Sequence, residues 1–163
     1  MSIIKWFVIA VVLLIVVAIA VGQLGFLQGT PPADLGVRDG KLKPPSMTEN
    51  SVTSQAALYP DHPQRKYAEI APLPVKGEGP VSIAQIKAIV EGMDGAKVVK
   101  SERGYLYAQF TTRLMKYVDD VEFWFDAAAN VIHVRSASRV GRGDLGANRK
   151  RIEAVRAALD PPR

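Results

Sequence analysis

The 163-residue chain contains no cysteine and only two histidines. Without cysteine it forms no disulfide, carries out no thiolate chemistry and accepts no lipid on a cysteine, which excludes a bacterial lipoprotein. His133 has no second histidine or cysteine near it, and His62 is remote in sequence, so the histidines predict no metal site. The phosphate-binding pattern G-x-x-x-x-G-K-S/T is also missing. We therefore expect no metal and no cofactor.

Charge is nearly absent from the start of the chain. Residues 3–22 contain one charged side chain, Lys5, and otherwise only apolar residues and glycine. Extended through residue 27, the run reaches the ~20 residues that a membrane-spanning helix needs, and Trp6 beside Lys5 suits a membrane–water boundary. The alternative is a cleaved signal peptide, because the triplet A-I-A at residues 18–20 imitates a cleavage site. The apolar run is longer than the roughly 7–15 residues usual in signal peptides. We expect an anchor over residues 1–27.

The anchor decides where the rest of the chain lies. Short N-terminal segments of this kind usually insert with the N-terminus in the cytoplasm. A strict positive-inside count leans the other way, because Arg38, Lys41 and Lys43 beyond the anchor outnumber Lys5. We expect a single-pass protein of the bacterial cell inner membrane, with its C-terminal domain on the periplasmic or extracytoplasmic side. The expected partners are the membrane, through residues 3–27, and an anionic ligand or an envelope protein. Export removes nucleic acid as a partner.

Charge and proline divide the remaining residues. The net charge of +5 arises within residues 135–163, where Lys and Arg outnumber the acids. Residues 28–66 are rich in proline and show no apolar periodicity, which predicts an extended tether. Residues 67–75 alternate like a strand, so the far end of the tether is expected to pack on the domain. The α+β domain is expected over residues 67–163.

Periodic patterns from residue 80 onwards predict the order of the elements. Ser82, with Gln85 three residues on, is a capping-box pattern that starts a helix, and Gly95 can end it. The expected strands cover residues 96–102, 104–115, 119–126 and 130–138, and the last helix covers residues 144–159. The order α-β-β-β-β-α predicts an α+β fold, with an antiparallel four-stranded sheet and helices on one face. The sheet becomes five-stranded if residues 67–75 join it.

Side-chain parity predicts which strand residues share a face. A four-residue loop between the last two strands sets Phe123 opposite Val134 in the core, and Glu122 opposite Arg135 on the other face. In the second strand Leu106, Ala108, Phe110 and Leu114 are expected to face the core. The opposite face carries Tyr105, Tyr107, Gln109, Arg113, Asp120, Glu122, Trp124, His133 and Arg135. We interpret that face as the solvent-exposed side of a half-covered sheet, with Glu122 and Arg135 as an ion pair. The alternative is a ligand cleft.

The stretch RSASRVGRGDLGANRKR, residues 135–151, joins the last strand to the last helix through a glycine-rich loop. Helix N-termini behind such loops bind anions, but Asp144 stands at the expected N-cap and repels them. We therefore favour a structural network over an anion site. The expected ion pairs join Arg135 or Arg139 to Asp119, Asp120 or Glu122.

Asn148 is a polar residue on the apolar face of the last helix, between Leu145 and Ile152. Its amide is expected to be buried, and buried amides are hydrogen-bonded. The expected partners are Ser136, Ser138 or a carboxylate of the Asp119–Asp120 pair, with Arg149 and Arg151 on either side. Arg142 and Lys150 are expected to point outward.

A family resemblance rests on YVDDVEFWFD and on VIHVRSASRVGRGDLGANRKRIE. These segments resemble the signature of domain-of-unknown-function family 1499, a bacterial and plastid family that is typically membrane-associated or exported. The resemblance covers roughly residues 48–159. Relatives often carry a cysteine where this chain has Ser51, so a thiol role is absent here. The resemblance implies a fold and an export route, and no established activity.

Two classes of function remain open. The first is a non-catalytic, membrane-tethered binding or accessory module. The second is an envelope hydrolase that uses Asp119, Asp120 or Glu122 with Arg135 and Arg139. A domain that binds anionic lipid headgroups is a further alternative. A cation site at Asp120 and Glu122 would need more oxygen ligands, and on strand parity His133 faces away from the nearby serines. The residues of the candidate site or structural clasp are Asp119, Asp120, Glu122, Trp124, His133, Arg135, Ser136, Ser138, Arg139, Asp144, Asn148, Arg149 and Arg151.

Overall fold

The fold was examined in a computed structural model, which describes residues 2–160. Met1 and residues 161–163, the end of the expected α+β domain, lie outside the described residues. The helices are α1 (Ser2–Gln23), the 3-10 helix η1 (Ala56–Leu58), α2 (Arg65–Ala68), α3 (Gly79–Glu91) and α4 (Ala147–Leu159). The strands are β1 (Ser51–Thr53), β2 (Leu73–Pro74), β3 (Ala96–Glu102), β4 (Tyr105–Thr111), β5 (Val118–Asp126) and β6 (Val131–Ser138).

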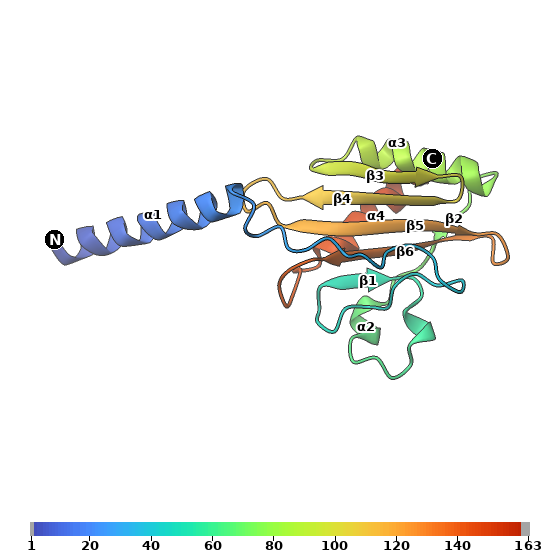
Figure 1. Cartoon of the computed structure of the whole chain (residues 1–163), viewed down its shortest axis with the longest axis horizontal. Helices are drawn as coiled ribbons and strands as arrows, with labels where there is room; N and C mark the ends of the chain where they lie inside the picture. Colours follow the sequence, from blue (N-terminus) through green and yellow to red (C-terminus); the bar gives the residue numbers. More distant parts are fainter. Residues whose placement is uncertain (1, 161–163) are drawn as a thin grey trace.

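The strands form one antiparallel six-stranded sheet, which confirms the α+β prediction. Its order is β1-β6-β5-β4-β3, and β2 also pairs with β6. β1 pairs with residues 135–137 of β6, and β2 pairs with residues 131–132. The sheet therefore has more strands than the four or five expected, because two short segments share the free edge of β6. Helices α3 and α4 cover one face of the sheet, as Figure 1 shows.

The core lies between the sheet and the two helices, where parity predicted it. Its fully buried side chains include Leu106, Ala108, Val121, Phe123, Ile132 and Val134 from the strands, and Ile86, Val90, Ile152 and Val155 from the helices. The prediction of the core is wrong for two residues. Leu114 is exposed because β4 ends at Thr111, and Leu145 is exposed because α4 begins at Ala147.

Helix α3 begins three residues before the predicted capping box. Its N-cap is Glu78, and Pro80 occupies the first turn, where its missing amide proton costs nothing. Ser82 therefore lies inside the helix. Its hydroxyl accepts a hydrogen bond from the Lys76 amide (2.7 Å) instead of capping the helix. The capping-box prediction is wrong, and Pro80 was the stronger signal.

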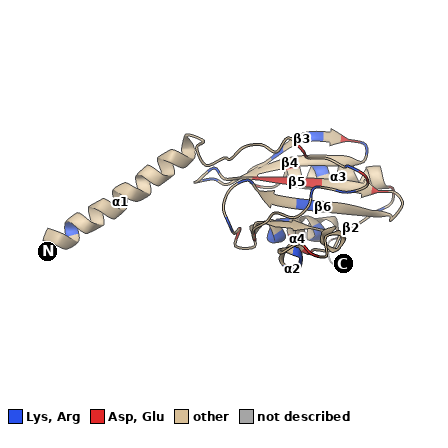
Figure 2. Cartoon of the chain, turned by 60° about the horizontal axis from the view of Figure 1, so that its bottom comes forward, with Lys and Arg blue, Asp and Glu red and all other residues tan. Residues whose placement is uncertain are grey.

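Helix α1 is long and apolar enough to cross a membrane, by length and composition, although a signal sequence passes the same test. Figure 2 shows it as a helix almost free of charged residues that leads away from the domain. Its C-terminal end is fixed to the turn between β4 and β5. The Gln23 side-chain amide donates to the carbonyls of Arg113 (3.1 Å) and Leu114 (2.8 Å). Gly22 lies so close to the Met115 backbone that a Cβ there would come within 2.8 Å of its carbonyl oxygen.

Residues 30–47, which we call the strap, run across the sheet face opposite α3 and α4 (Figure 1). The Gly36 amide donates to Glu122 (2.7 Å), and Arg135 donates to the Pro44 carbonyl (3.2 Å). Asp120, Glu122 and Arg135 are consequently buried. The interpretation of this face as solvent-exposed is therefore wrong. It failed because the strap has no periodicity that would predict its packing.

Candidate functional site

The hairpin of β5 and β6 has the predicted register. Glu122 lies opposite Arg135, Phe123 opposite Val134, and Trp124 opposite His133. The expected ion pair between Glu122 and Arg135 is absent, although both residues are described. Glu122 Oε1 instead accepts hydrogen bonds from the Gly36 amide and the Tyr105 hydroxyl, both at 2.7 Å. Glu122 and Arg135 therefore lie opposite each other in the sheet but bond to different groups, because the strap covers both side chains.

Asp119 and Asp120 point to opposite faces of the sheet, and an arginine binds each. Arg139 holds Asp120 through Nε (2.8 Å) and Nη2 (2.7 Å), and both side chains are almost completely buried. The predicted pairing of Arg139 with this acid is confirmed. On the helix-covered face, Arg151 Nη2 donates to Asp119 Oδ2 at 2.6 Å. That second pair was not predicted, although Arg151 was expected to flank the clasp.

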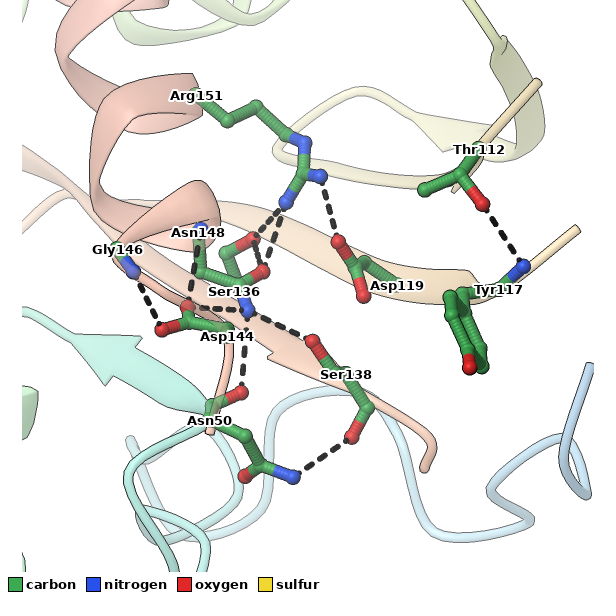
Figure 3. A network of polar contacts seen from close by, with 10 residues as sticks. All are labelled: Asn50, Thr112, Tyr117, Asp119, Ser136, Ser138, Asp144, Gly146, Asn148 and Arg151. Carbon is green, nitrogen blue, oxygen red and sulfur yellow. Dashed lines mark hydrogen bonds and ion pairs between the residues drawn. The ribbon is translucent and has the colours of Figure 1, made fainter. Parts of the chain in front are cut away.

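Asn148 stands at the centre of the polar network in Figure 3 and is fully buried, as predicted. Its Oδ1 accepts hydrogen bonds from the Ser136 hydroxyl (2.5 Å) and from Arg151 Nη1 (2.7 Å). Its Nδ2 lies within hydrogen-bonding distance of the Ser138 hydroxyl (3.0 Å), Asp144 Oδ2 (2.8 Å) and the Asn50 carbonyl (3.1 Å). Asn148 therefore connects α4 to β6 and to the residue before β1.

Asp144 binds the start of α4, although it is not the N-cap residue. The N-cap is Gly146, in the left-handed region at φ 77°. Asp144 Oδ1 accepts from the Gly146 amide (2.9 Å), and Oδ2 accepts from the Asn148 amide (3.0 Å). The Tyr67 hydroxyl also donates to Asp144, and Arg149 donates to the Tyr67 carbonyl (2.6 Å). Burial alone would raise the pKa of Asp144, but these hydrogen bonds outweigh it and lower the pKa.

His133 contacts a serine that the sequence did not indicate. Its Nδ1 lies 3.0 Å from the Ser54 hydroxyl, and its ring stacks on Trp124 with the centroids 5.4 Å apart. Burial lowers the pKa of His133. The arrangement is an incomplete catalytic relay, because Asp126 lies 3.6 Å from Nε2 and Ser54 Oγ already accepts the Val134 amide (2.9 Å).

A cavity of about 520 Å³ opens beside this network at the end of the sheet where α1 is attached. Its apolar side chains are Leu27, Tyr117, Val140, Leu145 and Ala147, and its polar side chains are Thr112, Asp119, Ser138 and Asp144. We call it the anchor cavity. Tyr117, Asp119, Ser138 and Asp144, which line the cavity, are among the side chains drawn in Figure 3. None of its lining residues is a lysine or an arginine.

The acidic side chains of β5 each have a partner within the chain. Within residues 2–160 no three His, Cys, Asp or Glu side chains gather where they could hold a metal ion. Asp119 and Asp120 are held by arginines, and Glu122 lies beneath the strap. Of these three acids only Asp119 lines the anchor cavity, and Arg151 holds it there.

The family comparison agrees with the resemblance drawn from the two sequence segments. The family model described as "Protein of unknown function (DUF1499)" matches residues 41–159. No curated protein and no solved structure matches the chain. The match begins inside the strap and ends at the last residue of α4, so it spans the whole sheet and both of the helices that cover it.

Proposed function

The chain belongs to the DUF1499 family of proteins of unknown function, and we propose that it is a non-catalytic binding module held at a membrane by α1. In this proposal the anchor cavity takes the apolar part of an amphiphile from the same membrane. The position of the cavity supports this ligand. Leu27 lines it four residues after α1 ends, so the cavity lies close to the point where α1 joins the domain.

The main support for the proposal is the exposure and backbone conformation of Leu145. Its side chain lines the anchor cavity and is 96% exposed, and its backbone lies in the left-handed region at φ 51°. That conformation costs a residue with a Cβ about 1–2 kcal/mol. A strained backbone that presents a large apolar side chain to solvent is typical of a functional contact. Leu24, Phe26 and Leu114, also exposed, belong to the same end of the domain.

The polar side chains of the anchor cavity favour an uncharged, hydroxyl-bearing end on the ligand. Ser138 Oγ accepts from Asn148, and its own proton makes no hydrogen bond with the described residues. Thr112 Oγ1 likewise accepts from the Tyr117 amide. Asp119 and Asp144 add carboxylates without any lysine or arginine in the lining, which disfavours an anion. An acylglycerol or a glycolipid fits this chemistry better than an anionic phospholipid.

The hydrolase hypothesis has less support than binding. It required free acids, and Asp119, Asp120 and Glu122 all have fixed partners. The Ser54–His133 contact does not form a complete Ser-His-Asp catalytic relay, because Asp126 lies 3.6 Å from His133 Nε2. Binding needs none of these groups to react.

The location follows from the anchor as part of the same proposal. We place the chain in a bacterial inner membrane with the domain on the periplasmic side. In this proposal α1 stays uncleaved and its short N-terminus stays in the cytoplasm. Two measurements test this: N-terminal sequencing of the membrane fraction, and protease digestion of spheroplasts. A mature chain that begins at Val21 would contradict the anchor. A domain protected from protease would contradict the orientation.

Lipid binding is tested by native mass spectrometry of the full chain released from membranes in a mild detergent. We expect wild type to carry a bound lipid, and Leu145→Asn to lose most of it. Asparagine tolerates a left-handed backbone better than leucine, so this variant should melt at or above the wild-type temperature. Leu58→Asn is the matched control, because Leu58 is also exposed but lies on η1. Equal lipid occupancy in wild type and Leu145→Asn would refute the proposal.

A further inference from the structure

Arg135 is a buried cation with few partners. It projects from β6 under the strap, and only 4% of its surface is exposed. Nε donates to the Pro44 carbonyl at 3.2 Å, and that is the single hydrogen bond that the Arg135 side chain makes with the described residues. It forms no ion pair within residues 2–160, whereas Arg139 and Arg151 each hold an aspartate. Buried charges are normally paired, so Arg135 needs an explanation.

The acids near Arg135 are engaged elsewhere. Asp120 is held by both Nε and Nη2 of Arg139. Glu122 Oε1 accepts hydrogen bonds from Gly36 and Tyr105, and its buried Oε2 makes no hydrogen bond with the described residues. Burial raises the pKa of Glu122. Burial lowers the pKa of Arg135, and it outweighs the nearby carboxylates of Glu122 and Asp120, which raise that pKa.

Arg135 lines a cavity of about 350 Å³ between the strap and the sheet. The strap contributes Lys43 and Ser46, and β6 with the residue after it contributes Ser138 and Arg139. Lys43 is partly exposed and paired with Asp34 at 2.6 Å, so a second cation stands where the cavity meets solvent. The volume falls within the range of about 300–1,000 Å³ found for ligand pockets.

We propose that this strap cavity binds a phosphate-class oxyanion on the guanidinium of Arg135. The two Nη groups of an arginine form a planar fork that matches two phosphate oxygens. Lys43, which also pairs with Asp34, supplies an ammonium donor at the mouth, and Ser46 supplies a hydroxyl donor. The paired state of Asp120 makes the site tolerable for an anion, since Arg139 already balances that carboxylate.

The strap cavity and the anchor cavity share Ser138 in their linings but lie on different sides of the sheet, and the phosphate site does not depend on the proposed function. It lies on the sheet face of Asp120, whereas the anchor cavity lies on the side of Asp119 and α4. Both are near the attachment of α1, because Gly29 approaches Arg139 and Val140 at the end of β6. Because the strap cavity is near the membrane anchor, its phosphate group could belong to a lipid headgroup or to a free phosphate compound in solution. Both ligands present the same phosphate oxygens to Arg135.

The test is isothermal titration of inorganic phosphate into the full chain in an uncharged maltoside detergent. We expect wild type to bind phosphate, and Arg135→Met to raise Kd by roughly 30-fold or more. Arg142→Met is the matched control, because Arg142 is exposed and lies outside the cavity lining. If Arg135→Met does not fold, Lys43→Gln replaces it, since Lys43 lies at the surface, and it should weaken binding several-fold. Absence of phosphate binding to wild type, or unchanged binding in the folded variant, would overturn the proposal.

The source is identified by competition in mixed micelles. Dioctanoyl phosphatidic acid and dioctanoyl glycerol share their chains and differ by the phosphate. Displacement of phosphate by the phosphatidic acid alone assigns a lipid headgroup, and displacement by neither assigns a free phosphate compound. Displacement by both would overturn recognition of the phosphate. Leu145→Asn should leave phosphate binding unchanged, so failure of the anchor cavity is distinguishable from failure of this site.

Discussion

Replacing Asn148 by alanine removes the centre of the network that joins α4 to β6. The side chain is fully buried, so water does not replace the hydrogen bonds that are lost. Its Oδ1 serves Ser136 and Arg151, and its Nδ2 serves Ser138, Asp144 and the Asn50 carbonyl. After the change Ser136 loses its acceptor, while Arg151 keeps Asp119 and Asp144 keeps two backbone amides.

The magnitude follows from which of these bonds involve charge. Hydrogen bonds to charged groups contribute about 1.5–3 kcal/mol each, and neutral ones contribute about 0.5–1.5 kcal/mol. Asn148 bonds two charged groups, Arg151 and Asp144. Contributions within one network do not add fully, and several partners keep other bonds. We therefore expect Asn148→Ala to lower the free energy of unfolding by about 3 kcal/mol. For a domain of this size that loss lowers Tm by about 10 °C.

Thermal unfolding followed by circular dichroism, on the full chain in detergent, measures this loss. The control is the double variant Arg142→Ala with Lys150→Ala, two exposed residues of the same basic stretch. It should stay within about 0.5 kcal/mol of wild type. An Asn148→Ala protein that melts with wild type would show that the network does not support the fold. If that protein also lost a ligand, residues 135–151 would be a binding site first.

Two further changes test the buried charges on the strap side of the sheet. Arg139→Met removes the ion pair of the buried Asp120 and leaves it only the hydrogen bond from the Tyr107 hydroxyl. This change should lower the free energy of unfolding, measured in urea, by about 3–5 kcal/mol, and adding Asp120→Leu to the same chain should recover much of the loss. An Arg139→Met protein as stable as wild type would contradict the pairing. Glu122→Gln tests the raised pKa of a carboxyl that faces Arg135, Asp120 and Tyr105. The folded state binds the Glu122 proton more tightly than the unfolded chain does, so this group favours folding below its ordinary pKa of 4.5 and loses that contribution as pH rises through the higher folded pKa. Relative to wild type, Glu122→Gln should therefore gain stability from pH 4.5 toward neutral pH, and parallel profiles would show that the pKa is not raised.

The sheet was predictable because its strands repeat with a period of two. Once Phe123 and Val134 face the core, a four-residue loop leaves one register, and Glu122 must lie opposite Arg135. The burial of Asn148 was predictable because the apolar residues of the last helix repeat with the helical period. An amide within an apolar stripe must be buried and bonded, and its partners are the polar residues where the strand ends.

The strap was not predictable because its contacts are long-range and lack periodicity. The Gly36 amide reaches Glu122 across 86 residues of sequence, and no local pattern signals a backbone donor at that distance. Because the strap covers this face, Glu122 and Arg135 are buried with separate partners and do not form the predicted surface ion pair. Leu145 was misassigned for a different reason. It matches the helical stripe, but the left-handed backbone at Leu145 and Gly146 delays the start of α4 and turns the side chain outward.

Photocrosslinking with a lipid that carries a diazirine at the end of its acyl chain tests the central claim most directly. The full chain is labelled in native membranes, digested and mapped by mass spectrometry. If the anchor cavity binds the apolar part of a membrane amphiphile, peptides containing Tyr117, Val140 and Leu145 should be labelled together with α1. Leu145→Asn should lose the label on the domain and keep it on α1. Label confined to residues 2–23 would contradict the account, because the domain would then touch no lipid chain.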